Sequence, residues 1–304
     1  MPQRGRKPKN LTIDKSETVQ KARDMQVYKS DDMVQKGRHR LTIQEQRCVL
    51  YAISKIKPED TAFQEYVFDI QLFYDACGIQ KESYTELKAI LNGLSDKAWD
   101  IPLKDDPDTI TRVRWFSTVR TNKKTGKVTI KFHEDMMPYL LEVTADGKFY
   151  TSYYLRFVLP MNCQYAPRLY ELLKSYQKNN RRWFFQLDEL KQKLSCEHYQ
   201  RFPDFRRWVL EPAVEEINKY TDLNVKPIFK KEGRGGKVVR VEFLMAKKSV
   251  PKLQEAIYEG NIVLDGQMNV EDYAAVLKQA AAELDEEKEF WGENGHGNHR
   301  KSSP

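Results

Sequence analysis

The sequence predicts an α+β protein in which one structural unit of helices and strands is used twice. The first observation is an order of helix, strand, helix, helix and β-hairpin, which can be read twice between residues 41 and 248. The second is that the two ends of the 304-residue chain lack this pattern and carry opposite charges. We therefore expect two tandem domains related by a pseudo-repeat, with flexible N- and C-terminal extensions.

The first unit begins with a helix whose start is marked by a capping box. Thr42 is a suitable N-cap residue, and Glu45 follows three positions later, where its side chain can return to the N-cap backbone. The apolar residues at helical spacing in this helix are Val49, Leu50, Ile53 and Ile56.

Alternation, periodicity and glycine predict the remaining elements of the first unit. They are a strand at 66–70, a short helix at 71–78, a longer helix at 83–99, and strands at 111–119 and 126–133. The apolar face of the longer helix consists of Leu87, Ile90, Leu91, Leu94 and Ala98. Gly126 is the expected turn residue between the last two strands.

The second unit repeats this order. Its elements are a helix at 167–177 that starts at Pro167, a strand at 181–185, a short helix at 187–195, a long helix at 203–220, and strands at 223–231 and 237–245. A glycine-rich turn joins the last two strands. Helix, strand, helix, helix and hairpin is the order of a winged helix, a helix-turn-helix followed by a hairpin wing.

We therefore divide the chain into four parts. They are a basic N-terminal arm at 1–27, a first winged helix at 28–160, a second winged helix at 161–248, and an acidic C-terminal extension with a disordered tail at 249–304. Residues 1–40 carry eleven basic and five acidic side chains, whereas residues 251–291 carry three basic and ten acidic ones. The net charge of +7 is consistent with an acidic partner such as nucleic acid, and equally with simple solubility.

Several classes of function lack support in the sequence. Four cysteines without a CxxC pair, no apolar leader and no apolar run long enough to span a membrane predict a cytoplasmic protein with reduced thiols and no membrane partner. No phosphate-binding loop, HExxH or HxH motif is present. We therefore expect no enzyme, no catalytic residues, no cofactor and no metal site.

The helix at 203–220 has an unusual charge order. Its apolar stripe consists of Phe205, Val209, Ala213 and Ile217. Arg207 lies roughly opposite the stripe, and Arg201 precedes the helix. Arg206 falls within the sector of the stripe, but in the first turn, where its long side chain can reach past the helix end. The helix dipole disfavours cations at this end, but a recognition helix inserts its N-terminal part into the major groove, where arginine binds guanine.

We therefore predict that Arg201, Arg206 and Arg207 read bases. The alternative is an exposed basic turn whose arginines pair with nearby acids such as Asp204. Pro212 lies inside the helix and should kink it or interrupt its hydrogen bonding.

The following hairpin supports a DNA-binding surface. Its basic side chains, Lys230, Lys231, Arg234 and Lys237, with Arg240 further along, flank a glycine-rich tip and suit phosphate or minor-groove contact. A solvated basic hairpin is the simpler interpretation of this segment taken by itself.

Two segments resemble a known family. "RFPDFRRWVLEPAVEEINKYTDLNV", continued by "KEGRGGKVVRVEF", resembles the second winged helix of plasmid replication initiators, the Rep proteins that bind repeated sites called iterons. "YKSDDMVQKGRHRLTIQEQRCVLYAISKI" is similar to the start of their first winged helix. The resemblance covers about residues 28–248 and excludes both ends.

The resemblance implies a mechanism. Such initiators bind iterons as monomers, open the origin, and recruit the host replication initiator and helicase. Dimers, in equilibrium with monomers, bind an inverted-repeat operator and repress their own gene, which contributes to plasmid copy control. The second domain reads DNA specifically, and the first contributes dimerisation and backbone contact.

Two further sets of contact residues complete the prediction. By topology, the first-domain residues at the matching helix start are Lys81, Ser83, Tyr84 and Lys88. The N-terminal "RGRKPK", with Arg4, Arg6 and Lys7, resembles an AT-hook that inserts into the minor groove, although a lysine separates Arg6 from the proline. A basic arm with non-specific phosphate attraction remains the alternative. For the whole protein, the alternative function is a dedicated winged-helix transcriptional repressor without initiator activity.

Overall fold

Two three-stranded antiparallel sheets with the same strand order organise the fold. The computed structural model describes residues 17–77, 84–102, 106, 108–145, 147–178, 180–233 and 236–248. The sheet order is β2-β6-β5 in the first half and β8-β10-β9 in the second. The strands are β2 (Tyr66–Asp69), β5 (Phe116–Asn122), β6 (Lys127–Phe132), β8 (Arg182–Gln186), β9 (Leu223–Glu232) and β10 (Lys237–Lys247). In each sheet the last strand lies in the centre, so the predicted pseudo-repeat of two winged helices is confirmed.

The helices of the first unit lie close to their predicted positions. They are α3 (Ile43–Ile53), α4 (Ile70–Cys77) and α5 (Tyr84–Ser95). Thr42 Oγ1 accepts from the Glu45 N–H at 3.3 Å, and Glu45 Oε2 accepts from the Thr42 N–H at 2.8 Å, which confirms the capping box. Gly126 has a φ of +65°, as its turn position requires.

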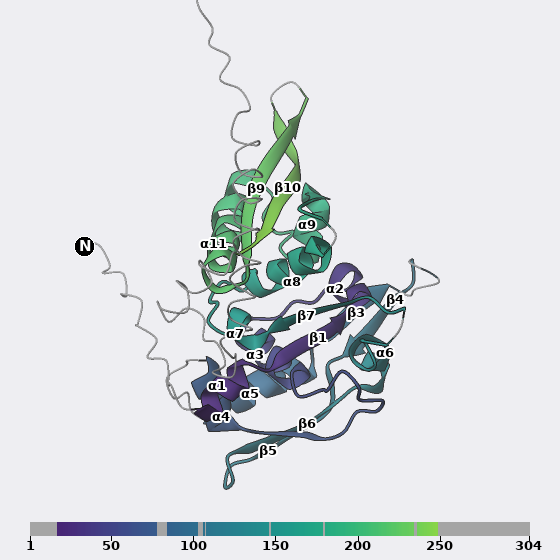
Figure 1. Ribbon diagram of the computed structural model, residues 1–304, viewed down its shortest axis with the longest axis vertical. Helices are drawn as coiled ribbons and strands as arrows, with labels where there is room; N and C mark the ends of the chain where they lie inside the picture. The colour runs from purple at the N-terminus through teal and green to yellow at the C-terminus, as the bar shows by residue number, and fades with distance from the viewer. Residues whose placement is uncertain are drawn as a thin grey trace, which may run out of the picture.

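The helices of the second unit also follow the prediction. They are α8 (Ala166–Gln177), α9 (Leu187–Lys193), α10 (Phe202–Phe205), a single π-helical turn at Arg206–Leu210, and α11 (Glu211–Tyr220). The last three form one continuous helical path, which we call the recognition helix, residues 202–220. Figure 1 shows β9 and β10 at one end of the long axis and β5 and β6 at the other.

The first unit contains a hairpin that the sequence patterns did not predict. The predicted helix at 83–99 ends at Ser95, and Ala98 lies on β3 (Ala98–Pro102) and not on the helix face. β3 pairs with β4 (Ile110–Arg114), so the single predicted strand at 111–119 is two strands, β4 and β5, that belong to different sheets. The helix stops because Trp99 and Ile101, both fully buried, alternate with more accessible neighbours as in a strand.

The N-terminal part of the fold begins earlier than residue 28. Helix α1 (Glu17–Arg23) buries Val19 and Ala22, and the Arg23 guanidinium donates to the Ala76 carbonyl at 2.9 Å. Within the predicted arm at 1–27, residues 17–27 therefore contribute to the folded unit.

β1 forms a separate two-stranded sheet with a distant part of the chain. The elements around it are β1 (Gln26–Ser30), α2 (Asp31–Lys36), a 3₁₀ turn (Glu134–Met136), α6 (Met137–Leu140), β7 (Tyr150–Tyr154) and α7 (Leu155–Val158). β1 pairs antiparallel with β7, which precedes the second winged helix. None of the helices that the structure describes is long and apolar enough to cross a membrane.

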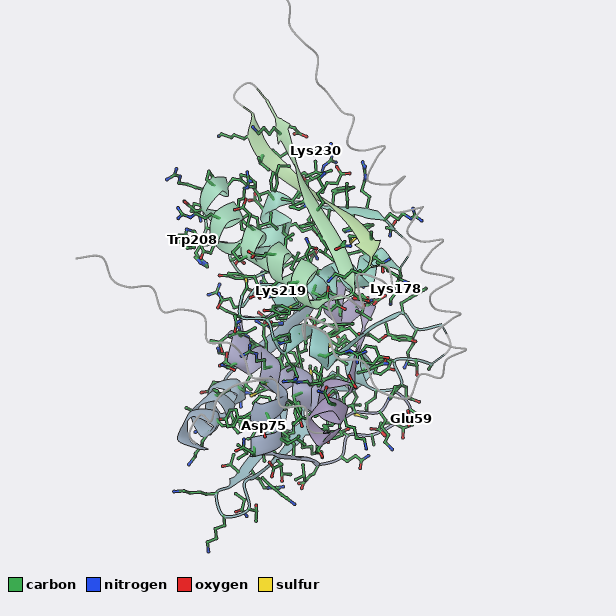
Figure 2. The ribbon with its side chains drawn as sticks, turned by 60° about the vertical axis from the view of Figure 1, so that its left-hand side comes forward. Glu59, Asp75, Lys178, Trp208, Lys219 and Lys230 are labelled. Atoms are coloured by element: carbon green, nitrogen blue, oxygen red, sulfur yellow. The ribbon has the colours of Figure 1, made fainter. Side chains whose placement is uncertain are left out.

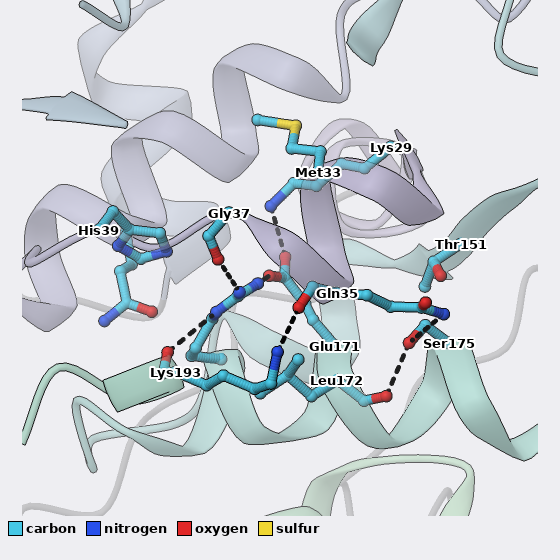
Figure 3. A network of polar contacts seen from close by, with 12 residues as sticks. Lys29, Met33, Gln35, Gly37, His39, Thr151, Glu171, Leu172, Ser175 and Lys193 are labelled. Atoms are coloured by element: carbon cyan, nitrogen blue, oxygen red, sulfur yellow. Dashed lines mark hydrogen bonds and ion pairs between the residues drawn. The ribbon is translucent and has the colours of Figure 1, made fainter. Parts of the chain in front are cut away.

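A buried polar network joins the two units (Figure 3). Glu171 of α8 accepts from Lys29 of β1 at 2.5 Å and from the Tyr153 hydroxyl of β7, and it pairs with Arg168 at 3.6 Å. Arg168 donates to the Gly37 carbonyl, and Lys193 donates to the Gln35 carbonyl at 2.6 Å. Burial alone would raise the pKa of Glu171, but Lys29 and Arg168 hold it below its ordinary value.

Candidate nucleic-acid interface

The buried face of the recognition helix is the predicted apolar stripe. Phe205, Val209, Ala213 and Ile217 are all fully buried. An ideal α-helix turns about 100° per residue, so a spacing of four residues drifts by about 40° at each step. The π-turn holds more residues per turn and reduces this drift, so the four side chains reach one core.

Pro212 accounts for the position of the π-turn. It has no N–H to donate to the carbonyl four residues earlier, at Trp208, and its ring would clash with that carbonyl in a regular α-helix. The wide turn at Arg206–Leu210 ends two residues before Pro212 and relieves this conflict. The predicted interruption of helical hydrogen bonding at Pro212 is therefore confirmed.

The three predicted arginines lie together at the exposed start of the recognition helix. Arg201, Arg206 and Arg207 are all exposed. Arg201 Nε lies 3.8 Å from Asp204, and Arg206 Nε lies 2.7 Å from Glu211. Since both pairs are exposed, each stabilises the fold by about 0–1 kcal/mol at most, so they can open for another acceptor. The alternative expectation, pairing with nearby acids, therefore holds for Arg201 and Arg206. The side chains of all three arginines are nevertheless accessible to a ligand.

Arg206 also connects the helix to the wing. Its guanidinium lies 5.1 Å from the centroid of the Phe229 ring on β9, and Phe229 packs edge-to-face against Phe202 of α10. The base of the wing and the first turn of the recognition helix therefore form one packed unit.

Trp208 is an exposed aromatic residue that was not among the predicted contact residues. Its side chain is 55% exposed and lies 4.8 Å from the Arg207 guanidinium. Figure 2 shows it projecting from the outer edge of the second unit. A signal was available, because on a helical wheel Trp208 falls outside the sector of the apolar stripe.

The wing carries exposed lysines on both strands. Lys230, Lys231 and Lys237 are exposed, and Lys230 lies 3.6 Å from Glu242. Arg240 lies over the exposed Phe184 ring at 4.7 Å. Arg234, at the tip, lies outside the described residues. The hairpin therefore presents cations next to the arginines of the recognition helix.

The residues predicted in the first unit and in the N-terminal arm lie only in part within the described ranges. Lys88 is exposed on α5, whose first residue is Tyr84. Lys81, Ser83 and the side chain of Tyr84 lie outside the described residues, as do Arg4, Arg6 and Lys7 of the arm and the extension at 249–304. Within the described ranges, no group of three or more His, Cys, Asp or Glu side chains is placed to hold a metal ion.

The chain matches two family models along most of its described length. Residues 26–174 match the model described as "Initiator Replication protein, WH1", and residues 186–245 match the one described as "Initiator Rep protein, WH2". Together the two segments include more than half of the chain. The first covers the first unit and most of α8, and the second runs from the end of β8 into β10.

Two curated proteins of Escherichia coli are similar to part of the chain. "PI protein" is 28% identical over 135 residues, which are 40% of this chain and 44% of that protein. "Replication initiation protein" is 34% identical over 113 residues, which are 36% of this chain and 34% of that protein. The similar segments thus span less than half the length of these relatives.

A solved structure shares the fold. "Crystal structure of Pi initiator protein in complex with iteron DNA" superposes with a TM-score of 0.61 at 19% identity. The superposition covers 74% of this chain and 98% of the other.

Proposed function

Because the chain belongs to the family of initiator replication (Rep) proteins, we propose that it is a plasmid replication initiator that binds repeated origin sites, iterons, in a sequence-specific manner. Family membership supports the role of initiator. The Pi initiator whose fold the chain shares is bound to iteron DNA in its crystal structure, which supports repeated duplex sites as the ligand.

The observation that carries DNA binding is the exposed cluster of arginines beside a lysine-bearing wing. Arg206 and Arg207 stand on the N-terminal part of a helix whose opposite face is fully buried. The N-terminal part of a recognition helix enters the major groove, where a guanidinium can donate two hydrogen bonds to guanine O6 and N7. In this proposal Arg206 and Arg207 read bases, and Arg201 contacts the site just before the helix.

The wing supplies phosphate contacts. Lys230, Lys231 and Lys237 are exposed, and Arg234 occupies the tip of the same hairpin in the sequence. Each lysine that neutralises a phosphate releases counterions, which adds affinity for any DNA sequence and makes binding sensitive to salt. The helix would thus determine which sequence is bound, and the wing would hold the helix against it.

Further steps of initiation follow as parts of the same proposal. Bound monomers open the origin and recruit the host replication initiator and helicase, and a dimer binds an inverted-repeat operator and represses the protein's own gene. Residues 161–248 read the site, while residues 28–160 provide dimerisation and backbone contact. Lys88, exposed on α5, is the described candidate for contact by the first unit. Separate measurements of oligomeric state on direct-repeat and inverted-repeat duplexes test this division.

Selection from a random duplex library tests the sequence-specific binding. The full-length protein is expected to enrich one motif, and the enriched motif is expected to occur as direct repeats near its gene. The variant Arg206→Ala/Arg207→Ala should enrich a less defined motif while it still binds DNA. Enrichment of no motif by the folded wild-type protein would contradict the proposal.

A further inference from the structure

The β5–β6 hairpin occupies in the first unit the place that the β9–β10 wing occupies in the second. In both sheets the hairpin joins the outer strand to the central strand, in the orders β2-β6-β5 and β8-β10-β9. We propose that β5–β6 is a second DNA-binding wing, which contacts backbone phosphates through Lys123, Lys124 and Lys127. This inference rests on the proposed function, because it names a further contact surface for the same duplex.

The turn of this hairpin is well defined. The Asn122 side-chain carbonyl accepts from the N–H groups of Lys124 and Thr125 at 3.0 and 3.1 Å, and the Gly126 N–H donates to the Asn122 carbonyl at 2.9 Å. Gly126 has a φ of +65°, which favours glycine. A fixed turn therefore presents Lys123 and Lys124 at the tip, with Lys127 at the start of β6.

The tip carries positive charge without a carboxylate of its own. Lys123, Lys124 and Lys127 are exposed, and residues 120–127 include no acidic residue. Three acids on or beside the strands of this sheet have other partners: Glu65 pairs with Arg120 on β5, Glu134 lies 3.9 Å from Lys131, and Asp69, opposite Lys127, caps α4 by accepting from Leu72 N–H at 3.0 Å.

The β9–β10 wing is less uniformly basic than the β5–β6 hairpin. It includes Glu232, and Lys230 lies 3.6 Å from Glu242. If the β9–β10 wing contacts phosphates, the same physical reasoning applies more strongly to the β5–β6 hairpin.

The positions of the two hairpins suit one extended duplex. Figure 1 places β9–β10 and β5–β6 at opposite ends of the long axis. In Figure 2 Trp208 and the β5–β6 turn both lie on the left-hand side of the molecule. Glu59 is labelled on the other side in Figure 2. DNA that lies along the side of the molecule on which Trp208 is exposed would meet the recognition helix between two lysine-bearing tips.

The test compares two double variants with the same change in charge. Lys123→Ala/Lys124→Ala removes the tip cations, and Lys57→Ala/Lys148→Ala removes two exposed lysines from other parts of the first unit. Affinity of the full chain for a random-sequence duplex is measured as a function of salt. The tip variant should lower the slope of log K against log salt by roughly two, because each lost phosphate contact contributes about 0.9. The control variant should leave the slope unchanged.

Hydroxyl-radical footprinting on the selected duplex gives a second readout. The tip variant should lose backbone protection at one end of the site and keep it at the recognition-helix end. Equal slopes for the tip and control variants, or an unchanged footprint, would overturn the inference.

A third variant separates the two proposals. Lys231→Ala in the β9–β10 wing is expected to lower the slope by roughly one. If the wild type binds no DNA, the proposed function fails. If the wild type binds and Lys231→Ala lowers the slope while the tip variant does not, only this inference fails.

Discussion

The Arg206 guanidinium lies 5.1 Å from the centroid of the Phe229 ring, so the recognition helix and the wing share a contact at the edge of the candidate interface. Arg206 is also held by Glu211 at 2.7 Å through Nε, whereas Arg207 lies against Trp208. A cation over an aromatic face is stabilised by about 0.5–1 kcal/mol at an exposed site. Arg206 is therefore restrained in orientation before DNA binds.

The arginines are expected to determine sequence preference. Arg206→Ala and Arg207→Ala should each reduce binding to the selected duplex by about 1–3 kcal/mol, with a much smaller loss on random DNA. Phe229→Leu, which keeps an apolar side chain but removes the ring under Arg206, should show a weaker loss of the same kind. Fluorescence anisotropy on both duplexes measures these effects.

The control for these variants is Lys219→Ala, a cation further along the same helix that lies over Tyr220 at 5.0 Å. It should leave the ratio of specific to random affinity unchanged. An equal loss on both duplexes for the arginine variants would contradict base reading.

Trp208 is expected to contribute an apolar contact in the major groove. An exposed tryptophan beside Arg207 can pack against the methyl group of thymine, which is the apolar feature of that groove. Trp208→Ala should weaken binding to the selected site. Replacing one thymine of that site by uracil, which removes its methyl group, should weaken binding of the wild-type protein by a similar factor. The two changes should not add when they are combined. Full additivity at every thymine would show that Trp208 does not contact a methyl group.

Glu171 is expected to hold the two units together. Glu171→Gln removes the negative charge between the buried Lys29 and Arg168, which should lower the free energy of unfolding by about 3–5 kcal/mol. Glu65→Gln, in an exposed pair with Arg120, should change it by less than about 1 kcal/mol. Urea denaturation followed by circular dichroism compares the two variants, and similar midpoints would contradict the structural role of the network.

His39 is expected to make stability depend on pH. It is partly buried, with its ring packed against Trp99 and Trp115. Burial, together with Arg168, Lys29 and Lys97, lowers its pKa well below 6.5. The unfolded chain therefore binds a proton that the folded chain does not, so stability falls as pH drops below 6.5, by up to about 1.4 kcal/mol per unit. His39→Gln should remove this slope between pH 6.5 and 5 in denaturation experiments. A variant with the wild-type slope would show that another group is responsible.

Local signals in the sequence were sufficient for much of this fold. The Thr42–Glu45 capping box and the Gly126 turn depend on residues close in sequence, so both could be predicted. The apolar stripe from Phe205 to Ile217 indicated the buried face of the recognition helix and therefore the exposed position of Arg207. Non-local pairing was harder. β1 and β7 pair across more than 100 residues, and nothing in either strand alone indicates its partner.

Two further differences have physical causes. Ala98 fits the spacing of the α5 apolar face, and only pairing with β4 assigns it to a strand. The contact between Arg206 and Phe229 depends on how the wing folds back on the helix, which helical periodicity does not specify. The sequence predicted the exposed position of Arg207 but not its contact with Trp208, because side-chain conformation decides whether neighbours in sequence touch.

Replication of a marker plasmid tests the central claim most directly. The plasmid carries the gene and its flanking repeats and has no other origin. The wild-type gene should sustain the plasmid, whereas Arg206→Ala/Arg207→Ala should lose it at similar protein levels. Lys57→Ala/Lys148→Ala should behave as wild type. If the wild-type protein is folded and binds intact repeats but the plasmid is lost, the initiator role is contradicted and a dedicated repressor becomes the better account.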